Sequence, residues 1–217
     1  MEDTMAGELL APQLREYLDR QVPPRPPEMQ IMEAYARERR FPIIGPVAGQ
    51  FCYLLARLIS ARRVFEMGSG YGYSTAWFAR AIKENGGGQV FHVVWDDDLS
   101  RRARGHLRTL GLDDVVEYRI AEAVQTLRDT EGPFDMIFND IDKEAYPASL
   151  PVIAAKLRPG GVLIVDNMFW NSRIFDRADT DATTEGVREL TRLMTADPDW
   201  MTSIVPLRDG LLVAVRR

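Results

Sequence analysis

The chain has 217 residues, 46% of them hydrophobic and 27% charged, a composition that excludes a wholly disordered or fibrous protein. Its 27 lysines and arginines against 32 aspartates and glutamates leave a net charge of −5, so no overall attraction to nucleic acid or to an anionic membrane is expected. The single cysteine, Cys52, excludes an internal disulfide, and two histidines are too few for a Cys/His zinc cluster.

Length, cysteine usage and the N-terminus together indicate one cytoplasmic domain. A chain of this length is most simply one domain, and a lone cysteine suits a reducing compartment. The N-terminus is acidic and lacks the basic and apolar regions of a secretory signal. No apolar run reaches the ~18 residues of a membrane helix, so no membrane partner is expected.

Three helices are predicted in residues 1–60, which we assign as a helical cover on a core formed by residues 61–217. Leucines at helical spacing and similar apolar patterns predict these helices over 5–21, 28–39 and 49–59. Two proline-containing segments, 22–27 and 42–46, interrupt them as an extended connector and a loop.

From residue 62 onward, short apolar strands alternate with helices. Strands are predicted at 63–67, 90–95, 115–119, 134–138 and 162–165, and helices at 74–83, 99–110, 121–129, 146–157 and 183–195. Two final strands are predicted at 201–206 and 211–215, and a turn at 208–210 is predicted to join them into a hairpin. The pattern predicts an α/β fold with a Rossmann-like, doubly wound, mostly parallel sheet that ends in antiparallel strands.

A glycine-rich loop follows the first predicted strand. Glu66 closes the strand, and Gly68, Gly70 and Gly72 precede the next helix. Ligands bind at the carboxyl ends of such strands, and glycines let the backbone approach them closely. The acid beside the loop suits a cationic ligand better than a pyrophosphate, which disfavours a nicotinamide-dependent oxidoreductase. A purely structural strand-to-helix turn is the alternative.

This acid followed by G-x-G-x-G resembles the first motif of the class I S-adenosylmethionine-dependent methyltransferases. Their cofactor is a sulfonium cation with an amino acid end and an adenosine end. The resemblance implies that the loop binds S-adenosylmethionine.

Polar residues end two later strands. Asp140 follows the strand at 134–138, and Asp166 and Asn167 follow the strand at 162–165. If the two strands are neighbours, three oxygen-bearing side chains meet at one edge of the sheet, and such ligands select Mg²⁺, Ca²⁺ or Mn²⁺ over zinc. Acids and asparagines at strand ends are also common turn formers and helix caps. Two such sites at adjacent strand ends favour the metal.

Lys143 lies three residues beyond Asp140. Methyl transfer to oxygen needs an oxyanion, and the pKa of a phenol is ~10. A divalent cation can acidify the hydroxyl, and a lysine in a desolvated pocket can take its proton. The spacing therefore indicates a metal-assisted base.

The chain resembles the metal-dependent O-methyltransferases, the group of catechol and caffeoyl-CoA O-methyltransferases and small bacterial relatives. The family pattern F-x-D-x-D-K-x-x-Y matches Phe138, Asp140, Asp142, Lys143 and Tyr146. The pattern D-N followed by two hydrophobic residues, W, x and G or S matches residues 166–172, and G-[ST]-x-x-G-Y-S matches Gly68, Ser69, Gly72, Tyr73 and Ser74.

The resemblance implies a role for each matched position. Lys143 is implied as the catalytic residue, and Asp140, Asp166 and Asn167 as ligands of a divalent cation, most simply Mg²⁺. Cofactor contacts are implied at Ile44, Glu66, Gly68, Ser69, Gly70, Ser74, Trp95, Asp96, Ala121, Glu122, Ala123 and Asp140. A homodimer is also implied, with contributions from the N-terminal helices.

One position departs from the family pattern. The second strand usually ends in an acid that holds the ribose hydroxyls, and that position is Val94 here. Asp96, two residues on, can substitute through a shifted turn. Trp95 falls where an apolar residue packs on the adenine, or else is a core aromatic at a strand end.

We therefore expect an S-adenosylmethionine-dependent O-methyltransferase acting on a small phenolic, catechol-like acceptor, with Met168, Phe169 and Trp170 as candidate pocket walls. One rival acceptor is a hydroxylated uridine in tRNA, which the acidic composition disfavours. Another rival is a degenerate enzyme that only binds the cofactor, suggested by Val94.

Overall fold

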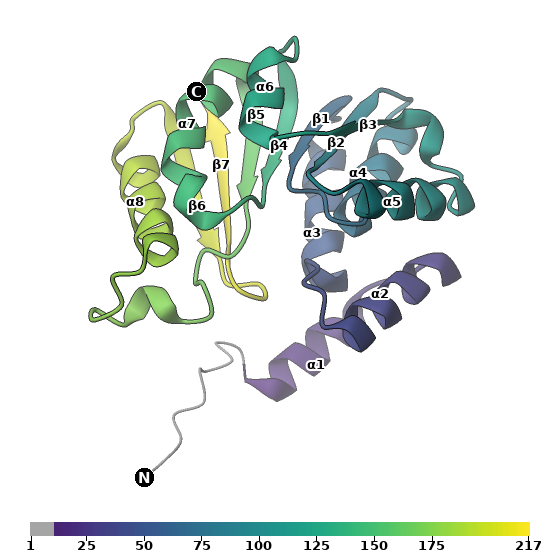
Figure 1. Ribbon diagram of the computed structural model, residues 1–217, viewed down its shortest axis with the longest axis horizontal. Coiled ribbons are helices and arrows are strands. Elements are labelled where there is room, and N and C mark those ends of the chain that lie inside the picture. The colour runs from purple at the N-terminus through teal and green to yellow at the C-terminus, as the bar shows by residue number, and fades with distance from the viewer. Residues whose placement is uncertain (1–10) are drawn as a thin grey trace.

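The computed structural model describes residues 11–217, and within this range seven strands form one sheet in the order β3-β2-β1-β4-β5-β7-β6 (Figure 1). The strands are β1 (Arg63–Met67), β2 (Gln89–Val94), β3 (Val116–Ile120), β4 (Phe134–Asn139), β5 (Leu157–Val165), β6 (Trp200–Val205) and β7 (Leu211–Arg216). The α-helices are α1 (Pro12–Gln21), α2 (Pro27–Arg39), α3 (Gly45–Leu58), α4 (Tyr73–Glu84), α5 (Asp97–Thr109), α6 (Ala123–Asp129), α7 (Tyr146–Lys156) and α8 (Ala182–Ala196).

Strands β1 to β5 are parallel, and β7 pairs antiparallel with both β5 and β6. The strand order reverses between β1 and β4, which is where a doubly wound sheet opens a crevice for ligands. The predicted fold class and the antiparallel C-terminal strand are confirmed. The hairpin is inserted so that β7 separates β5 from β6, and this places the β6–β7 turn beside the carboxyl end of β5.

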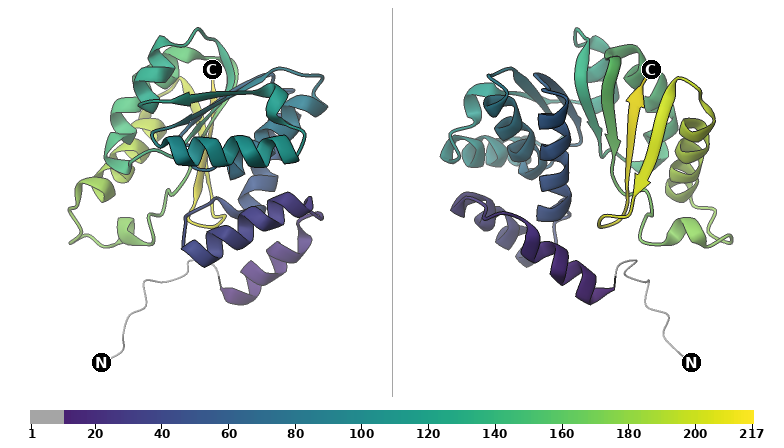
Figure 2. Two further views of the ribbon diagram at one scale, coloured as in Figure 1. Left: turned by 45° about the vertical axis from the view of Figure 1, so that its right-hand side comes forward. Right: turned by 180° about the vertical axis from the view of Figure 1, so that it is seen from behind.

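Helices cover both faces of the sheet, which explains why central strands such as β4 are almost entirely buried and largely apolar. Helices α3, α4 and α5 lie on one face, and α6, α7 and α8 on the other (Figure 1, Figure 2). Phe78 of α4 packs on Phe138 in the first core, with ring centroids 5.5 Å apart. Phe65, Phe91 and Phe134 pack together in the second core.

The predicted element boundaries agree with the structure to within a few residues, except at three places. The first predicted helix starts at residue 5, and its part before residue 11 lies outside the described residues. Helix α3 begins at Gly45, four residues earlier than predicted, because Pro46 fits the first helical turn instead of breaking it. Strand β5 begins at Leu157, five residues earlier than predicted, so it is longer than its apolar run.

The N-terminal helices lie at the end of the sheet where the carboxyl ends of the parallel strands meet. Figure 2 shows α1 and α2 beneath this end, on the side of the β6–β7 turn. Helix α3 packs tightly on α4 at Gly49, where a Cβ atom would stand 2.1 Å from Nε1 of Trp77. None of the helices in residues 11–217 is both long and apolar enough to span a membrane.

Candidate active site

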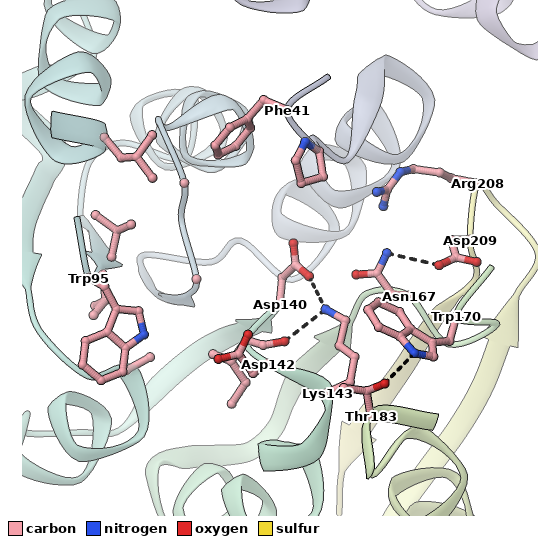
Figure 3. Close-up of a pocket in the computed structure, with 18 of the residues that line it drawn as sticks. Phe41, Trp95, Asp140, Asp142, Lys143, Asn167, Trp170, Thr183, Arg208 and Asp209 are labelled. Carbon is pink, nitrogen blue, oxygen red and sulfur yellow. Dashed lines mark hydrogen bonds and ion pairs between the residues drawn. The ribbon is translucent and has the colours of Figure 1, made fainter. Parts of the chain in front are cut away.

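A cavity of about 950 Å³ opens at the carboxyl ends of the parallel strands (Figure 3). Its walls come from the glycine loop after β1, from the ends of β2, β3, β4 and β5, from the β6–β7 turn and from the loop before α3. This volume is in the range of cavities that bind small molecules and cofactors. The cavity lies at the switch point of the sheet, as predicted.

The glycine loop is held in a conformation that only glycine adopts easily. Gly68, Gly70 and Gly72 all have positive φ angles, of 87°, 50° and 90°. A Cβ atom on Gly68 would stand 2.4 Å from the carbonyl oxygen of Asp140. The loop after β1 therefore lies directly against the end of β4, and a side chain at residue 68 would push the two apart.

Glu66 lies buried beneath this loop. One of its carboxylate oxygens accepts a hydrogen bond from Thr75 Oγ1 at 2.5 Å, and the other, Oε1, has no hydrogen-bond partner. Burial raises the pKa of Glu66 to about 7, and the hydroxyls of Ser74, Thr75 and Ser69 partly oppose the rise. The acid is thus held next to the loop with one oxygen left unsatisfied, an arrangement that suits a cationic ligand.

The end of the cavity at the carboxyl ends of β2 and β3 is largely apolar. Val94, Trp95 and Ala121 line it, and the Trp95 side chain is 69% exposed (Figure 3). Asp96 does not line the cavity. One of its carboxylate oxygens accepts the backbone N–H of Leu99 at 3.0 Å and caps α5. Glu122 similarly caps α6.

Lys143 projects into the other end of the cavity, where its side chain is 7% exposed. Its ammonium donates to Asp140 Oδ1 at 2.8 Å and to the carbonyl oxygen of Ile141 at 3.0 Å (Figure 3). It also lies over the rings of Tyr146 and Trp170, 5.0 and 5.5 Å from their centroids. The lysine head is therefore fixed at the cavity wall.

Asp140 titrates well above an ordinary aspartate. Burial raises its pKa to about 6, Lys143 lowers it, and Asp166 raises it further. The rise reflects two carboxylates held close together in a poorly hydrated place.

Asp166 and Asn167 follow β5 and meet the β6–β7 turn. The side chain of Asp166 is completely buried, and its Oδ2 atom accepts a hydrogen bond from Arg208 Nη1 at 2.5 Å. Its Oδ1 atom accepts the backbone N–H of Asn167 at 2.8 Å. The amide of Asn167 donates to Asp209 Oδ2 at 3.3 Å, and Asp209 Oδ1 accepts the backbone N–H of Asn171.

The predicted metal ligands come together in space, but the arrangement does not fit a divalent cation. Strands β4 and β5 are neighbours, and both Asp140 and Asn167 line the cavity. Both oxygens of Asp166 are already engaged, and the guanidinium of Arg208 stands against them. We therefore derive no catalytic step through a metal ion.

The predicted site residues divide into two sets. Eight of the residues implied for the cofactor, the base or the metal line the cavity directly: Gly68, Gly70, Trp95, Ala121, Ala123, Asp140, Lys143 and Asn167. Asp140 is implied both as a cofactor contact and as a metal ligand. The others do not line it: Ile44, Glu66, Ser69, Ser74, Asp96, Glu122 and Asp166. Of the three candidate wall residues, only Trp170 lines the cavity.

Sequence reasoning missed Phe41, Thr183 and Arg208, which also line the cavity. Each comes from a segment that carries no motif of its own. For Arg208, the one available signal was its place in the turn immediately before Asp209 and Gly210.

Comparisons with known proteins identify the family of this chain. A family model described as O-methyltransferase matches residues 30–217. A catechol O-methyltransferase of Mycobacterium tuberculosis is 35% identical over 151 residues, which cover 69% of this chain and 67% of that protein. An O-methyltransferase from Bacillus cereus, solved in complex with SAH, superposes with a TM-score of 0.85 at 27% identity and covers 94% of this chain and 97% of that one. The O-methyltransferase TomG from Streptomyces achromogenes, involved in tomaymycin synthesis and solved with SAM, gives a TM-score of 0.84 at 26% identity, with 94% and 96% coverage.

Proposed function

This chain belongs to the O-methyltransferase family and is an S-adenosylmethionine-dependent O-methyltransferase, and on this premise we propose that it methylates a small phenol with vicinal, catechol-like hydroxyl groups. The observation that carries the proposal is the composition of one cavity. Its apolar end and glycine loop suit the cofactor, and its charged, aromatic end suits a hydroxylated ring.

The residues present fit S-adenosylmethionine. The backbone of Gly68 and Gly70 forms one wall without side chains, and Trp95 supplies a flat surface at the apolar end. Glu66 lies buried next to the loop with an unpaired oxygen. Bound S-adenosylmethionine supplies a methyl group from its sulfonium centre and leaves as a neutral thioether.

Lys143 is the base in this proposal. A phenol with a pKa of ~10 is mostly neutral at pH 7, so its proton must be removed before or during transfer. In this proposal the ammonium of Lys143 first releases its proton to water. The free Nζ then accepts the phenol's proton, and Asp140, 2.8 Å away, stabilises the ammonium that forms again.

The acceptor end of the cavity favours a flat ring over a chain. Trp170 is held by a hydrogen bond from its Nε1 to Thr183 Oγ1 at 3.0 Å, and Phe41 lines the cavity from the loop before α3. Aromatic rings stack on such walls with little loss of side-chain entropy. The donors Lys143 and Arg208 and the acceptors Asp140 and Asp209 around the same space can serve two neighbouring hydroxyls.

A methyl-transfer screen tests the acceptor class. Catechols, single phenols and tRNA that carries hydroxylated uridine are each incubated with S-adenosylmethionine, with and without chelator, and the thioether product is quantified. We expect catechols to turn over fastest and tRNA not at all. Methylation of tRNA in place of phenols would refute the acceptor, and cofactor binding with no turnover on any acceptor would favour a degenerate enzyme.

The sequence also predicts help from a divalent cation, a homodimer and a cytoplasmic setting. The chelator arm of the screen addresses the first, and sedimentation of the purified protein addresses the second.

A further inference from the structure

We propose that the guanidinium of Arg208 takes the place of a divalent cation in this site, so that this chain holds the ionised acceptor oxygen with its own arginine and transfers methyl without a metal ion. The inference rests on the proposed function only in taking the acceptor to be a hydroxyl compound. It concerns a residue to which neither the sequence motifs nor the family comparisons assign a role.

The contact between Arg208 and Asp166 joins two strand ends that are 42 positions apart. Nη1 lies 2.5 Å from Asp166 Oδ2, and the second oxygen of Asp166 is taken by the backbone N–H of Asn167. Because the Asp166 side chain is fully buried, it offers no solvent-facing oxygen to a second cation. One of the three predicted metal ligands, Asp166, is thus already neutralised by the chain itself.

The charges around Arg208 hold it in its ionised form. A guanidinium stays protonated in proteins, and that of Arg208 lies against the Asp166 carboxylate. A divalent cation on the oxygens of Asp140 and Asp166 would stand beside this permanent positive charge and be repelled by it. Arg208 and a divalent cation therefore compete for the same place beside Asp166.

The backbone fixes Arg208 where it is. Its φ angle is 52°, in the left-handed region that a non-glycine residue adopts only when its surroundings impose it. The turn is bonded to the segment after β5, because Met168 N–H donates to the Gly210 carbonyl and Phe169 N–H donates to the Asp209 carbonyl. The side chain of Asp209 adds a bond from the Asn171 backbone N–H. The guanidinium is thus placed in advance at the cavity, without reorganisation when the acceptor binds.

The two positively charged side chains of the cavity, Arg208 and Lys143, have different chemical roles. An arginine stays protonated, so it cannot act as the base, but its planar group carries five N–H donors and can hold an oxyanion. Lys143 first releases its ammonium proton to water, and the free Nζ then takes the acceptor's hydroxyl proton. The oxygen lone pair then forms the bond to the methyl carbon, the carbon–sulfur bond breaks, and its electron pair stays on sulfur. Arg208 balances the negative charge of the oxygen until the bond has formed.

The test compares the wild type with Arg208→Gly and Arg208→Lys. Glycine suits the left-handed backbone at this position, so Arg208→Gly removes the guanidinium without adding strain. Arg40→Gly is a matched control, because Arg40 has the same φ angle of 52° and an exposed side chain. Binding of Mn²⁺ is followed by electron paramagnetic resonance, which needs no acceptor, and turnover is measured in the presence of chelator.

We expect the wild type and Arg40→Gly to keep their turnover in chelator and to bind no Mn²⁺ at millimolar concentration. Arg208→Gly should lose roughly 100-fold of the metal-free turnover, acquire Mn²⁺ binding at the freed oxygens, and recover part of its turnover with Mg²⁺. Arg208→Lys, which keeps the charge but not the planar fork, should retain an intermediate metal-free rate.

Two results would overturn the inference. One is a wild-type enzyme that chelator inactivates and Mg²⁺ restores. The other is Mn²⁺ binding to the wild type as strong as to Arg208→Gly. Failure of the acceptor proposal alone would appear as an absence of phenol methylation with the Mn²⁺ results unchanged, so the two failures are distinguishable.

Discussion

The two ends of the cavity are built in different ways. At the ends of β1, β2 and β3, the wall is backbone and apolar surface, with glycines, Val94 and Trp95 facing the space and the acid Glu66 hidden beneath. At the ends of β4 and β5 and at the β6–β7 turn, the wall is a set of charged side chains that includes Asp140, Lys143 and Arg208.

The difference separates binding by shape from chemistry by charge. The first end comes mainly from short local segments, each of which follows a strand directly. The second end depends on pairs such as Asp166 and Arg208, which are distant in the sequence and oppositely charged. Substitutions at the charged end should therefore affect the rate of transfer, and those at the apolar end should affect cofactor affinity or stability.

The largest effect is expected at the charged end. Lys143→Met keeps most of the apolar stem and removes the ammonium that Asp140 holds, so kcat should fall by roughly 100-fold or more, as for loss of a general base. Cofactor affinity, measured by calorimetry, should change little. Lys156→Met is the control, since Lys156 bonds the Thr130 carbonyl outside the cavity. Undiminished kcat in Lys143→Met would mean that lysine is not the base.

Gly68→Ala tests the apolar end. The new Cβ atom would lie 2.4 Å from the carbonyl oxygen of Asp140 at a φ of 87°, so the loop must shift. We expect cofactor affinity to fall about tenfold and the free energy of unfolding to fall by about 2 kcal/mol. Gly87→Ala is the control, because its φ of 96° imposes the same backbone strain with no atom within 4 Å. Equal cofactor affinity in the two variants would show that the close approach at Gly68 is unimportant.

The buried acid at the apolar end predicts a pH effect on stability. Because the pKa of Glu66 is raised from 4.5 to about 7, the folded protein keeps a proton that the unfolded chain releases. Stability without ligand should therefore fall as the pH rises from about 4.5 to about 7. Glu66→Gln removes this titration and should reduce the fall by roughly 3 kcal/mol.

Thermal unfolding at several pH values measures the effect of Glu66→Gln. A smaller decline should remain in the variant, because the pKa of Asp140 is also raised by burial, to about 6. An identical decline in wild type and variant would exclude Glu66 as its source.

The smallest effect on cofactor affinity is expected at Asp96. Its carboxylate caps α5 through the N–H of Leu99, so Asp96→Ala should lower the free energy of unfolding by about 1 kcal/mol and leave cofactor binding nearly unchanged. Trp95→Ala is the matched neighbour and should weaken cofactor binding severalfold through lost stacking. A large loss of affinity in Asp96→Ala with unchanged stability would instead assign the ribose hydroxyls to this acid.

Much of the fold could be predicted from local patterns. Apolar runs such as the one at β4 predict buried strands, and the polar residues after them predict where the strands end. Since the carboxyl ends of parallel strands share one edge, Asp140, Asp166 and Asn167 could be placed together from sequence, and β4 and β5 are indeed neighbours. The glycines after β1 likewise required a tight turn, which their positive φ angles confirm.

What sequence determined by itself was thus the doubly wound fold, its family and the strand ends that carry the site. Tertiary structure decided which side chains line the site, because their positions depend on long-range packing. The insertion of β7 between β5 and β6 carries Arg208 to Asp166. This placement has no local signal, since a strand's position in a sheet, and the partner of a side chain 42 positions away, are chosen by competition among contacts that are distant along the chain.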